Sequence, residues 1–230
     1  MATRGASTTL GRRTVGVVTS AAPARGRPGR KPTLSRDDVV TAALEVVDAQ
    51  GFQALSLRAV ARQLDVAPMN LYTYVEDSAE LEVLVIERVI AQRTADVVWP
   101  EEWRACLLAF AEGLDALVHE HPAMLEAYAR GAVRTPTALQ VADLVLGRLR
   151  AGGLSVAEAL TLYEAVHALV LGHALLARSA TATTPVVPVD LPYAAEAFAA
   201  GLRQGRTRLR SQLGLLLAGM DSTVRRPEGR

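Results

Sequence analysis

The sequence has a single cysteine, few aromatic residues and almost no lysine. With Cys106 alone, no disulfide can form within one chain, so a disulfide scaffold is excluded and a reducing cytoplasm is the expected compartment. We interpret Cys106 as a small buried hydrophobic residue. Aromatic residues make up 4% of the chain, whereas hydrophobic residues make up 50% and are mainly Ala, Leu and Val. Because Ala and Leu favour helices, we predict an all-α protein.

Long hydrophobic runs are also missing. The longest candidate, 165–177, contains His167 and His173 and is shorter than the ~18 residues that a membrane span needs. Near the N-terminus, the apolar stretch 15–18 is shorter than the ~7 residues of a signal-peptide core. The sequence therefore predicts neither a membrane partner nor an export signal.

Acidic residues are absent from the first 36 positions. That stretch carries eight basic residues, which leaves 17 basic against 24 acidic residues in the remainder, although the whole chain has a net charge of only +1. Residues 1–33 are rich in Gly, Ala, Thr, Pro and Arg without periodicity, which predicts a disordered basic arm. Two interpretations stay open for this arm: a solubilising tail, or a segment that contacts a polyanion.

Helical patterns begin at Ser35, which precedes Asp37 and Asp38 as an N-cap precedes acids in a first turn. Gly51 marks the predicted end of this helix. Ser78 is the predicted cap of a longer helix that ends before Trp99. A proline-rich loop covers 180–192, and the chain is expected to fray from about Asp221. The patterns predict helices near 35–50, 56–64, 67–74, 78–98, 101–119, 122–131, 136–151, 155–179 and 193–218.

Residues 55–75, LSLRAVARQLDVAPMNLYTYV, read as two short helices joined by about three residues. This is the length of a helix-turn-helix. Asp65 occupies the turn, where a left-handed residue can be needed and Asp tolerates that conformation better than most residues. The side chains expected to stay exposed on the second helix are uncharged, polar or aromatic, which suits contact with base edges while other groups hold the phosphates.

Residues 35–90 resemble the DNA-binding domain of the tetracycline-repressor (TetR) family. The resemblance rests on the run AALEVVDAQGFQALSLRAVARQLDV, on LYTYV, and on ELEVLVIERV. It implies that Arg58 and Asn70 face bases, and that Pro68 and Met69 touch base edges or thymine methyls. The resemblance also implies that the hydroxyls of Tyr72 and Tyr74 reach phosphates, with Thr73 able to do either.

Two of the implied DNA contacts have alternatives. Tyr74 can instead be a core aromatic residue. At the start of the helix after the motif, where this family often has a lysine, Glu76 and Asp77 precede Ser78, which offers only a hydroxyl and a backbone N–H. The arm could compensate, because its Arg-Gly-Arg stretch resembles an AT-hook that lies in a narrow minor groove. The arm residues expected at DNA are Arg25, Arg27, Arg30 and Lys31.

The C-terminal half resembles the tetracycline-repressor subgroup, through Trp103 to Pro122, the turn at 135–137, and the helix GLSVAEALTLYEAVHALVLGHALL. This implies a ligand cavity under 103–178 and a homodimer through helices near 155–179 and 193–218, packed as a four-helix bundle. Most candidate lining residues could equally serve as core. They are Trp103, Leu107, Phe110, Leu114, Leu125, Tyr128, Leu139, Tyr163, His167 and Val170.

The subgroup recognises a magnesium–drug complex, so a metal site needs consideration. His119 and His121 lie near a helix boundary, where His121 is expected as a capping group, and His167 and His173 are six residues apart and share no helix face. Tyr128 or a neighbour aligns where the subgroup has its magnesium-binding histidine. We therefore expect no metal and no cofactor, with a structural or ligand-lining role for His167 and His173.

Together these features predict a repressor that binds a palindromic double-stranded operator as a dimer and is released by a small-molecule effector. The expected domains are a basic arm at 1–33, a helix-turn-helix domain at 34–80, a ligand-binding and dimerisation domain at 81–220, and a tail at 221–230. The sequence has no G-x-S-x-G elbow, phosphate loop or dinucleotide fingerprint, which argues against an enzyme. A ligand-independent or activating DNA-binding regulator stays open as an alternative.

Overall fold

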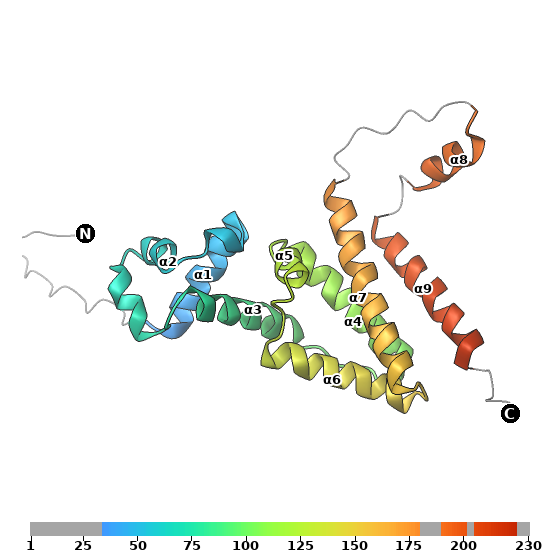
Figure 1. The fold of residues 1–230 in the computed structure, drawn as a ribbon, viewed down its shortest axis with the longest axis horizontal. Coiled ribbons are helices and arrows are strands. Elements are labelled where there is room, and N and C mark those ends of the chain that lie inside the picture. Colours follow the sequence, from blue (N-terminus) through green and yellow to red (C-terminus); the bar gives the residue numbers. More distant parts are fainter. Residues whose placement is uncertain (1–33, 180–189, 202–204, 225–230) are drawn as a thin grey trace, which may run out of the picture. The chain divides into compact units, whose positions relative to one another are not determined.

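The computed structural model describes residues 34–179, 190–201 and 205–224 (Figure 1). Within these ranges the chain forms helices and turns without a strand, which confirms the all-α prediction. The basic arm, most of the proline-rich loop and residues 225–230 lie outside the described residues. The helices are α1 (Arg36–Gln50), η1 (Phe52–Ala54), α2 (Leu57–Gln63), η2 (Pro68–Thr73), α3 (Ser78–Thr94), α4 (Trp103–Glu120), α5 (Met124–Ala129), α6 (Pro136–Ala151), α7 (Val156–Ser179), α8 (Pro192–Gly201) and α9 (Gly205–Val224).

Helix α1 begins with the cap that the sequence predicts. The Asp38 N–H donates to Ser35 Oγ at 3.1 Å, and the Ser35 N–H donates to the Asp38 carboxylate at 2.8 Å, so the two residues form a capping box. These hydrogen bonds lower the pKa of Asp38. The helix ends at Gly51, whose φ of +81° favours glycine. Residues such as Val39 and Ala43 on its inner face are fully buried.

The turn after α2 confirms the left-handed position predicted at Asp65. Its φ is +52°, the only positive value among the described non-glycine residues. Just beyond it, the Val66 N–H donates to the Ala61 carbonyl at 3.0 Å, which closes the helix end. At the start of α2, the Ser56 hydroxyl accepts from the Ala59 N–H at 3.2 Å, as expected for an N-cap.

The helix predicted at 67–74 is a 3₁₀-helix, η2, instead of an α-helix. The Asn70 N–H donates to the Ala67 carbonyl and the Tyr74 N–H to the Leu71 carbonyl, both at 2.9 Å and three residues apart. Pro68 starts the segment without a backbone donor. Because so short a segment has few α-type hydrogen bonds to gain, the tighter 3₁₀ geometry suffices to hold it.

Helix α3 differs from its prediction at both ends. Its N-cap is Asp77, whose carboxylate accepts from the Ala79 and Glu80 N–H groups at 2.8 and 2.9 Å, so Ser78 is the first helical residue instead of the cap. The helix ends at Thr94, whose hydroxyl donates to the Ile90 carbonyl at 2.8 Å. Helix α3 packs against α1, α4 and α6 (Figure 1). The domain boundary proposed at residue 80 therefore lies within a continuous helix.

Helix α4 is the centre of the C-terminal core, with α6 and α7 against it. Its buried residues include Cys106, which is fully inaccessible, as predicted. Burial raises the pKa of this thiol. The α6–α7 connection passes close to α4, because a Cβ on Gly152 would lie 2.2 Å from Cδ1 of Trp103. Glycine is therefore required for this close approach.

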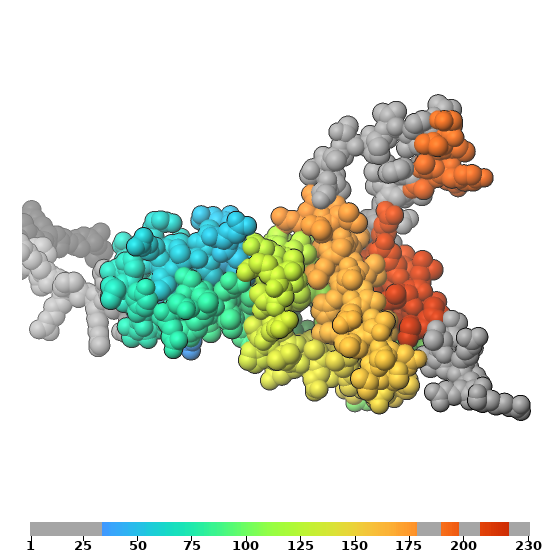
Figure 2. Space-filling view, in the orientation of Figure 1, coloured from blue at the N-terminus to red at the C-terminus, as the bar shows by residue number. Residues whose placement is uncertain are grey.

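The segment predicted as one helix over 193–218 contains two, α8 and α9. Helix α9 lies beside α7 (Figure 2) and buries Leu209, Leu213 and Leu217 at helical spacing. Helix α9 continues to Val224. The prediction that the chain frays from about Asp221 is therefore wrong for residues 221–224.

Helix α7 is more apolar than the sequence analysis allowed. By length and composition, its stretch Val156–Arg178 could cross a membrane, although no run of that length was expected. Such a helix is also typical of a packed core, and α7 contacts α4, α6 and α9.

Candidate DNA-binding turn and ligand cavity

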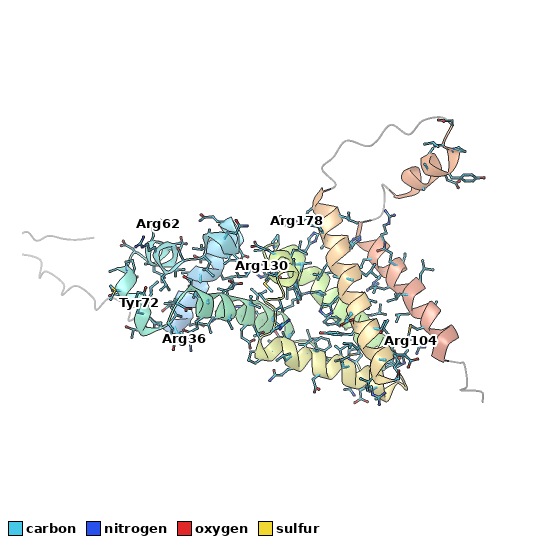
Figure 3. All side chains as sticks on the ribbon, in the orientation of Figure 1. Arg36, Arg62, Tyr72, Arg104, Arg130 and Arg178 are labelled. Carbon is cyan, nitrogen blue, oxygen red and sulfur yellow. The ribbon has the colours of Figure 1, made fainter. Side chains whose placement is uncertain are left out.

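The segment η2, which we call the recognition turn, holds a row of exposed side chains. Met69 and Tyr72 are 74% and 55% exposed, and Pro68, Asn70 and Thr73 are also exposed. Tyr72 lies on the recognition turn and Arg62 on α2 in Figure 3. The exposed surface of the turn combines amide, hydroxyl and aromatic groups without formal charge, which suits contact with base edges in a major groove.

One buried residue anchors the recognition turn to the protein. Leu71 is fully buried in the core, and Val75, just after the turn, is 3% exposed. The Val75 N–H donates to the Leu71 carbonyl at 3.1 Å. Helix α2 packs against the turn, so the exposed side chains stand on a surface held from behind.

Tyr74 does not have the free hydroxyl that a phosphate contact requires. Its side chain is half-buried, and the hydroxyl donates to the Leu34 carbonyl at 2.6 Å. This arrangement favours the core alternative for Tyr74. The hydrogen bond ties the end of the recognition turn to the residue where the basic arm joins α1.

The remaining predicted DNA contacts lie in different environments. Arg58 is exposed on α2, Ser78 is half-buried at the start of α3, and Arg25, Arg27, Arg30 and Lys31 lie outside the described residues. Arg62, also exposed on α2, follows Arg58 by four residues and lies on the same helix face. At the start of α3, Glu80 pairs with Arg36, which offsets part of the acidic charge found there.

A cavity of about 310 Å³ lies between α3 and the C-terminal core, and we call it the central cavity. It is predominantly apolar, as small-molecule sites usually are. Helices α3 to α7 and the segment after α3 all contribute. Its lining residues are Ile90, Arg93, Thr94, Val97, Trp99, Ala109, Phe110, Gly113, Leu114, Leu117, Tyr128, Val133, Ala138, Leu139, Val141, Ala142, Tyr163 and His167.

Six of the ten predicted lining residues lie at this cavity: Phe110, Leu114, Tyr128, Leu139, Tyr163 and His167. The other four lie elsewhere. Leu107 and Val170 are fully packed in the core, and Trp103 lies against Gly152. Leu125 lines a separate hollow beside α1 and α7. Helix periodicity predicts burial, but it cannot distinguish a buried side chain at a cavity from one packed on all sides.

The contribution of α3 to the cavity was missed. Ile90, Arg93 and Thr94 of α3 line it, and so does Val97 just after the helix. Their spacing of i, i+3, i+4 and i+7 marks one face of a helical stretch, so the signal was present in the sequence. The helix that follows the recognition turn therefore also forms one wall of the cavity.

Four rings form a cluster at the cavity. Phe110 stacks on Tyr163 with centroids 5.2 Å apart, and His167 lies 4.9, 4.5 and 6.0 Å from Phe110, Tyr163 and Tyr128. Burial lowers the pKa of His167, partly opposed by its hydrogen bond to the Tyr163 carbonyl, so the ring is neutral at pH 7. Because a carbonyl only accepts, the proton lies on Nδ1, 3.2 Å away, and Nε2 is left as an acceptor.

Both tyrosines at the cavity are neutral phenols. Burial raises the pKa of Tyr163 to about 12, and burial together with Tyr163 raises the pKa of Tyr128 well above its ordinary value. They therefore offer hydroxyl donors at neutral pH. Among the residues that the structure describes, no three His, Cys, Asp or Glu side chains gather as a metal site would need.

Polar contacts connect α3 to the C-terminal core. Arg130, after α5, pairs with Glu82 of α3 at 2.8 Å. Glu87 of α3 accepts hydrogen bonds from the Thr137 N–H at 3.2 Å and from its hydroxyl, at the start of α6. Partial burial alone would raise the pKa of Glu87, but its hydrogen bonds with Thr135 and Thr137 outweigh this and lower it. Tyr128 and Ala138, beside these contacts in sequence, line the cavity.

A second connection joins the core to α1. His121, the C-cap of α4, lies with its Nδ1 2.9 and 3.1 Å from the two carboxylate oxygens of Asp48. The capping position agrees with the prediction for His121. Its side chain therefore ties the end of α4 to α1.

Comparison of the sequence with known proteins places these features in a family. Residues 99–201 match the model of the "Tetracyclin repressor-like, C-terminal domain". The chain is 36% identical to the HTH-type transcriptional repressor DrrR1 of Streptomyces coeruleorubidus over 152 residues, 64% of this chain and 56% of that protein. It is 29% identical to an HTH-type transcriptional regulator of Saccharopolyspora erythraea over 142 residues, 62% of this chain and 60% of that protein. The match thus spans under two thirds of both relatives.

The tetracycline repressor protein class E of Escherichia coli is matched more fully, with 32% identity over 174 residues, 72% of this chain and 80% of that protein. Among solved structures, the TetR regulator SCO7222 of Streptomyces coelicolor has a TM-score of 0.66 at 25% identity, covering 84% of this chain and all of that one. ActR of the same species has a TM-score of 0.69 at 21% identity, covering 85% and 98%, and shares the fold. This chain belongs to the tetracycline-repressor family of transcriptional regulators.

Proposed function

We propose that this chain is a ligand-responsive repressor that binds a palindromic operator as a homodimer and releases it when a small molecule occupies the central cavity. The observation that carries the proposal is the position of α3. Its first turn follows the recognition turn, and its last turn lines the cavity. One helix can therefore report the state of the cavity to the DNA-binding residues.

The proposed DNA contacts begin with Arg58 and Asn70, which are both exposed. Bidentate contacts of arginine to guanine and asparagine to adenine each contribute ~1–3 kcal/mol of discrimination. Pro68, Met69 and Thr73 would contact base edges, and the Tyr72 hydroxyl a phosphate. We assign Tyr74 to positioning the turn because its hydroxyl is bonded to Leu34. Ser78 and the arm residues would contact phosphates or the minor groove.

The proposed dimer uses α7 and α9. Helix α7 exposes Leu160, Leu175 and Leu176, and α9 exposes Leu215, which is 76% accessible. Exposed apolar side chains on two adjacent helices are costly in water, and a second copy of the same pair would cover them in a four-helix bundle. Such a dimer has to hold the two recognition turns ~34–36 Å apart to reach successive major grooves.

Release needs only a difference in ligand affinity between two conformations of the protein. A ligand that enlarges the central cavity would displace Tyr128 and the start of α6, and with them the partners of Glu82 and Glu87 on α3. A coupling of ~1–3 kcal/mol lowers DNA affinity ~5–150-fold.

The relatives support each half of this proposal. DrrR1 is described as a repressor, and BioQ, 25% identical with a TM-score of 0.58, has been solved with its double-stranded DNA operator. ActR has been solved with actinorhodin, and the Acinetobacter baumannii TetR variant Q116A with minocycline. The same fold thus binds an operator in one relative and small molecules in others.

The test begins by selecting operator sequences from a random DNA pool and measuring affinity by fluorescence anisotropy at fixed salt. We expect Asn70→Ala to weaken specific binding at least tenfold, whereas Gln53→Ala, an exposed change on η1, leaves it unchanged. Equal affinities of the two variants would contradict the assignment of the recognition turn.

The release arm of the test screens small molecules for those that bind the purified protein and measures operator affinity with and without them. Ligands should lower operator affinity, and DNA should lower ligand affinity by the same factor, because coupling is reciprocal. Ligands that occupy the cavity without any change in operator affinity would favour a ligand-independent regulator.

A further inference from the structure

The central cavity has an unusual charge composition. Arg93 is the one formally charged residue among its lining residues, and it is exposed at the last turn of α3. The other titratable groups that line the central cavity are neutral, since His167 has a lowered pKa and Tyr163 and Tyr128 have raised ones. The cavity therefore combines an aromatic, apolar interior with a single positive charge at its edge.

Arg93 also borders two neighbouring hollows. One, of about 390 Å³, contains Asp96 and Glu120, and both of these acids are exposed to solvent. The other, of about 520 Å³, lies between α4 and α9 and contains Glu112, Asp115 and Arg210. Within the part of the chain that the structure describes, Arg93 forms no ion pair.

Asp115 also lines the hollow between α4 and α9. Its side chain is 8% exposed. The neighbouring acid, Glu112, is already paired with Arg210 at 2.6 Å. Arg93 borders the same hollow, but no ion pair joins it to Asp115 among the described residues, so its guanidinium is available to a ligand.

We propose that the effector is a planar aromatic acid whose ionised group binds Arg93. The inference rests on the proposed function and names the class of ligand. The rings of Phe110, Tyr163 and His167 would stack on the aromatic part, since aromatic pairs gain from such contacts. The guanidinium of Arg93 would bind the acid through two parallel hydrogen bonds.

The size of the cavity agrees with this class. About 310 Å³ is at the lower end of the ~300–1,000 Å³ range of small-molecule sites, which suits a ligand of two or three fused rings. A cationic ligand is disfavoured, because Arg93 would repel it and no carboxylate lines the central cavity. Since Arg93 belongs to α3, a ligand bound to its guanidinium acts on the helix that follows the recognition turn.

The test compares three probes of equal ring size by calorimetry: anthraquinone-2-carboxylate, its neutral carboxamide and 2-(aminomethyl)anthraquinone. With the full-length dimer, we expect the acid to bind at least tenfold tighter than the amide and the amine weakest. Quenching of Trp99 fluorescence provides a second signal from the cavity wall. Trp103→Phe removes the other tryptophan of the chain as background.

Substitutions at Arg93 should change the acid-to-amide affinity ratio. Arg93→Gln should reduce the ratio to about 1, and Arg93→Lys should restore part of it. Arg62→Gln, an exposed arginine on α2, is the matched control and should change neither affinity.

Several outcomes would overturn the inference. They are tighter binding of the amide or amine than of the acid, equal losses for acid and amide in Arg93→Gln, or no binding of any of the three probes. Each can occur while Asn70→Ala and Gln53→Ala still differ in operator binding. Failure of the aromatic-acid inference is therefore distinguishable from failure of the proposed function.

Discussion

Gly152 and Trp103 approach so closely that a Cβ on Gly152 would lie 2.2 Å from the indole Cδ1 and 2.8 Å from Nε1. The indole is 7% exposed and belongs to the core, so it cannot swing into solvent without loss of packing. This contact fixes the α6–α7 connection against the start of α4.

We predict that Gly152→Ala lowers the free energy of unfolding by ~1–3 kcal/mol, as overpacking of a tight core does. Gly147→Ala in α6 is the control, since nothing lies within 4 Å of its added Cβ and the change should be neutral or stabilising by up to ~1 kcal/mol. Urea denaturation followed by circular dichroism measures both. Equal stabilities would mean that the indole relocates freely.

The left-handed backbone at Asp65 predicts a difference between two substitutions. Asp65→Gly should leave stability unchanged or slightly raised, whereas Asp65→Val should lower it by ~1–2 kcal/mol because a β-branched residue resists positive φ. Asp96→Val, at an exposed site with negative φ, should have little effect. Thermal unfolding measures these changes, and an equal loss for both valine variants would contradict the backbone argument.

The Tyr74 hydroxyl predicts a stability effect instead of a direct DNA effect. Tyr74→Phe removes the hydrogen bond to the Leu34 carbonyl and should lower the free energy of unfolding by ~0.5–1.5 kcal/mol. Tyr72→Phe removes an exposed hydroxyl and should weaken operator binding without changing stability. Chemical denaturation and anisotropy together separate the two roles. The reverse pattern would return Tyr74 to the phosphate contacts.

The lowered pKa of Glu87 predicts a pH-dependent contribution to stability. A carboxyl group whose pKa falls on folding stabilises the protein fully above its unfolded value, near 4.5, and loses that contribution as pH falls through the folded value. The difference in unfolding free energy between the wild type and Glu87→Gln should therefore be larger at pH 7 than at pH 3.5. Urea midpoints at both pH values measure it, and a constant difference would show that ionisation of Glu87 is not involved.

The parts of the fold that the sequence predicted depend on local signals. Ser35 with Asp38 forms a capping box, Gly51 ends α1, and Asp65 adopts a left-handed conformation, because each feature is decided by residues a few positions apart. Helical patterns also predicted the helices beyond residue 100, and the family resemblance added the expected cavity and the dimer helices. Local rules were less accurate where either of two neighbouring residues could be the N-cap. At the start of α3 we predicted Ser78, but the N-cap is Asp77.

The candidate site was predicted less completely, for a physical reason. Leu107 and Phe110 look equivalent in the sequence, yet only Phe110 borders the central cavity. Which buried side chain borders a cavity depends on how helices cross, and that involves residues far apart in the chain. Arg93 was missed for the opposite reason, since an exposed arginine near a helix end is ordinary until its neighbours are known.

The length of α3 has a geometric consequence. Its 17 residues make a rod of ~25 Å without a proline or glycine at which it could bend. A tilt of about 5° at one end would therefore move the other end by ~2 Å, several times the tolerance of a hydrogen bond to a base. In a symmetric dimer both α3 helices tilt together. A small rotation far from DNA would therefore be enough to change the spacing of the two recognition turns, so that they no longer match successive major grooves.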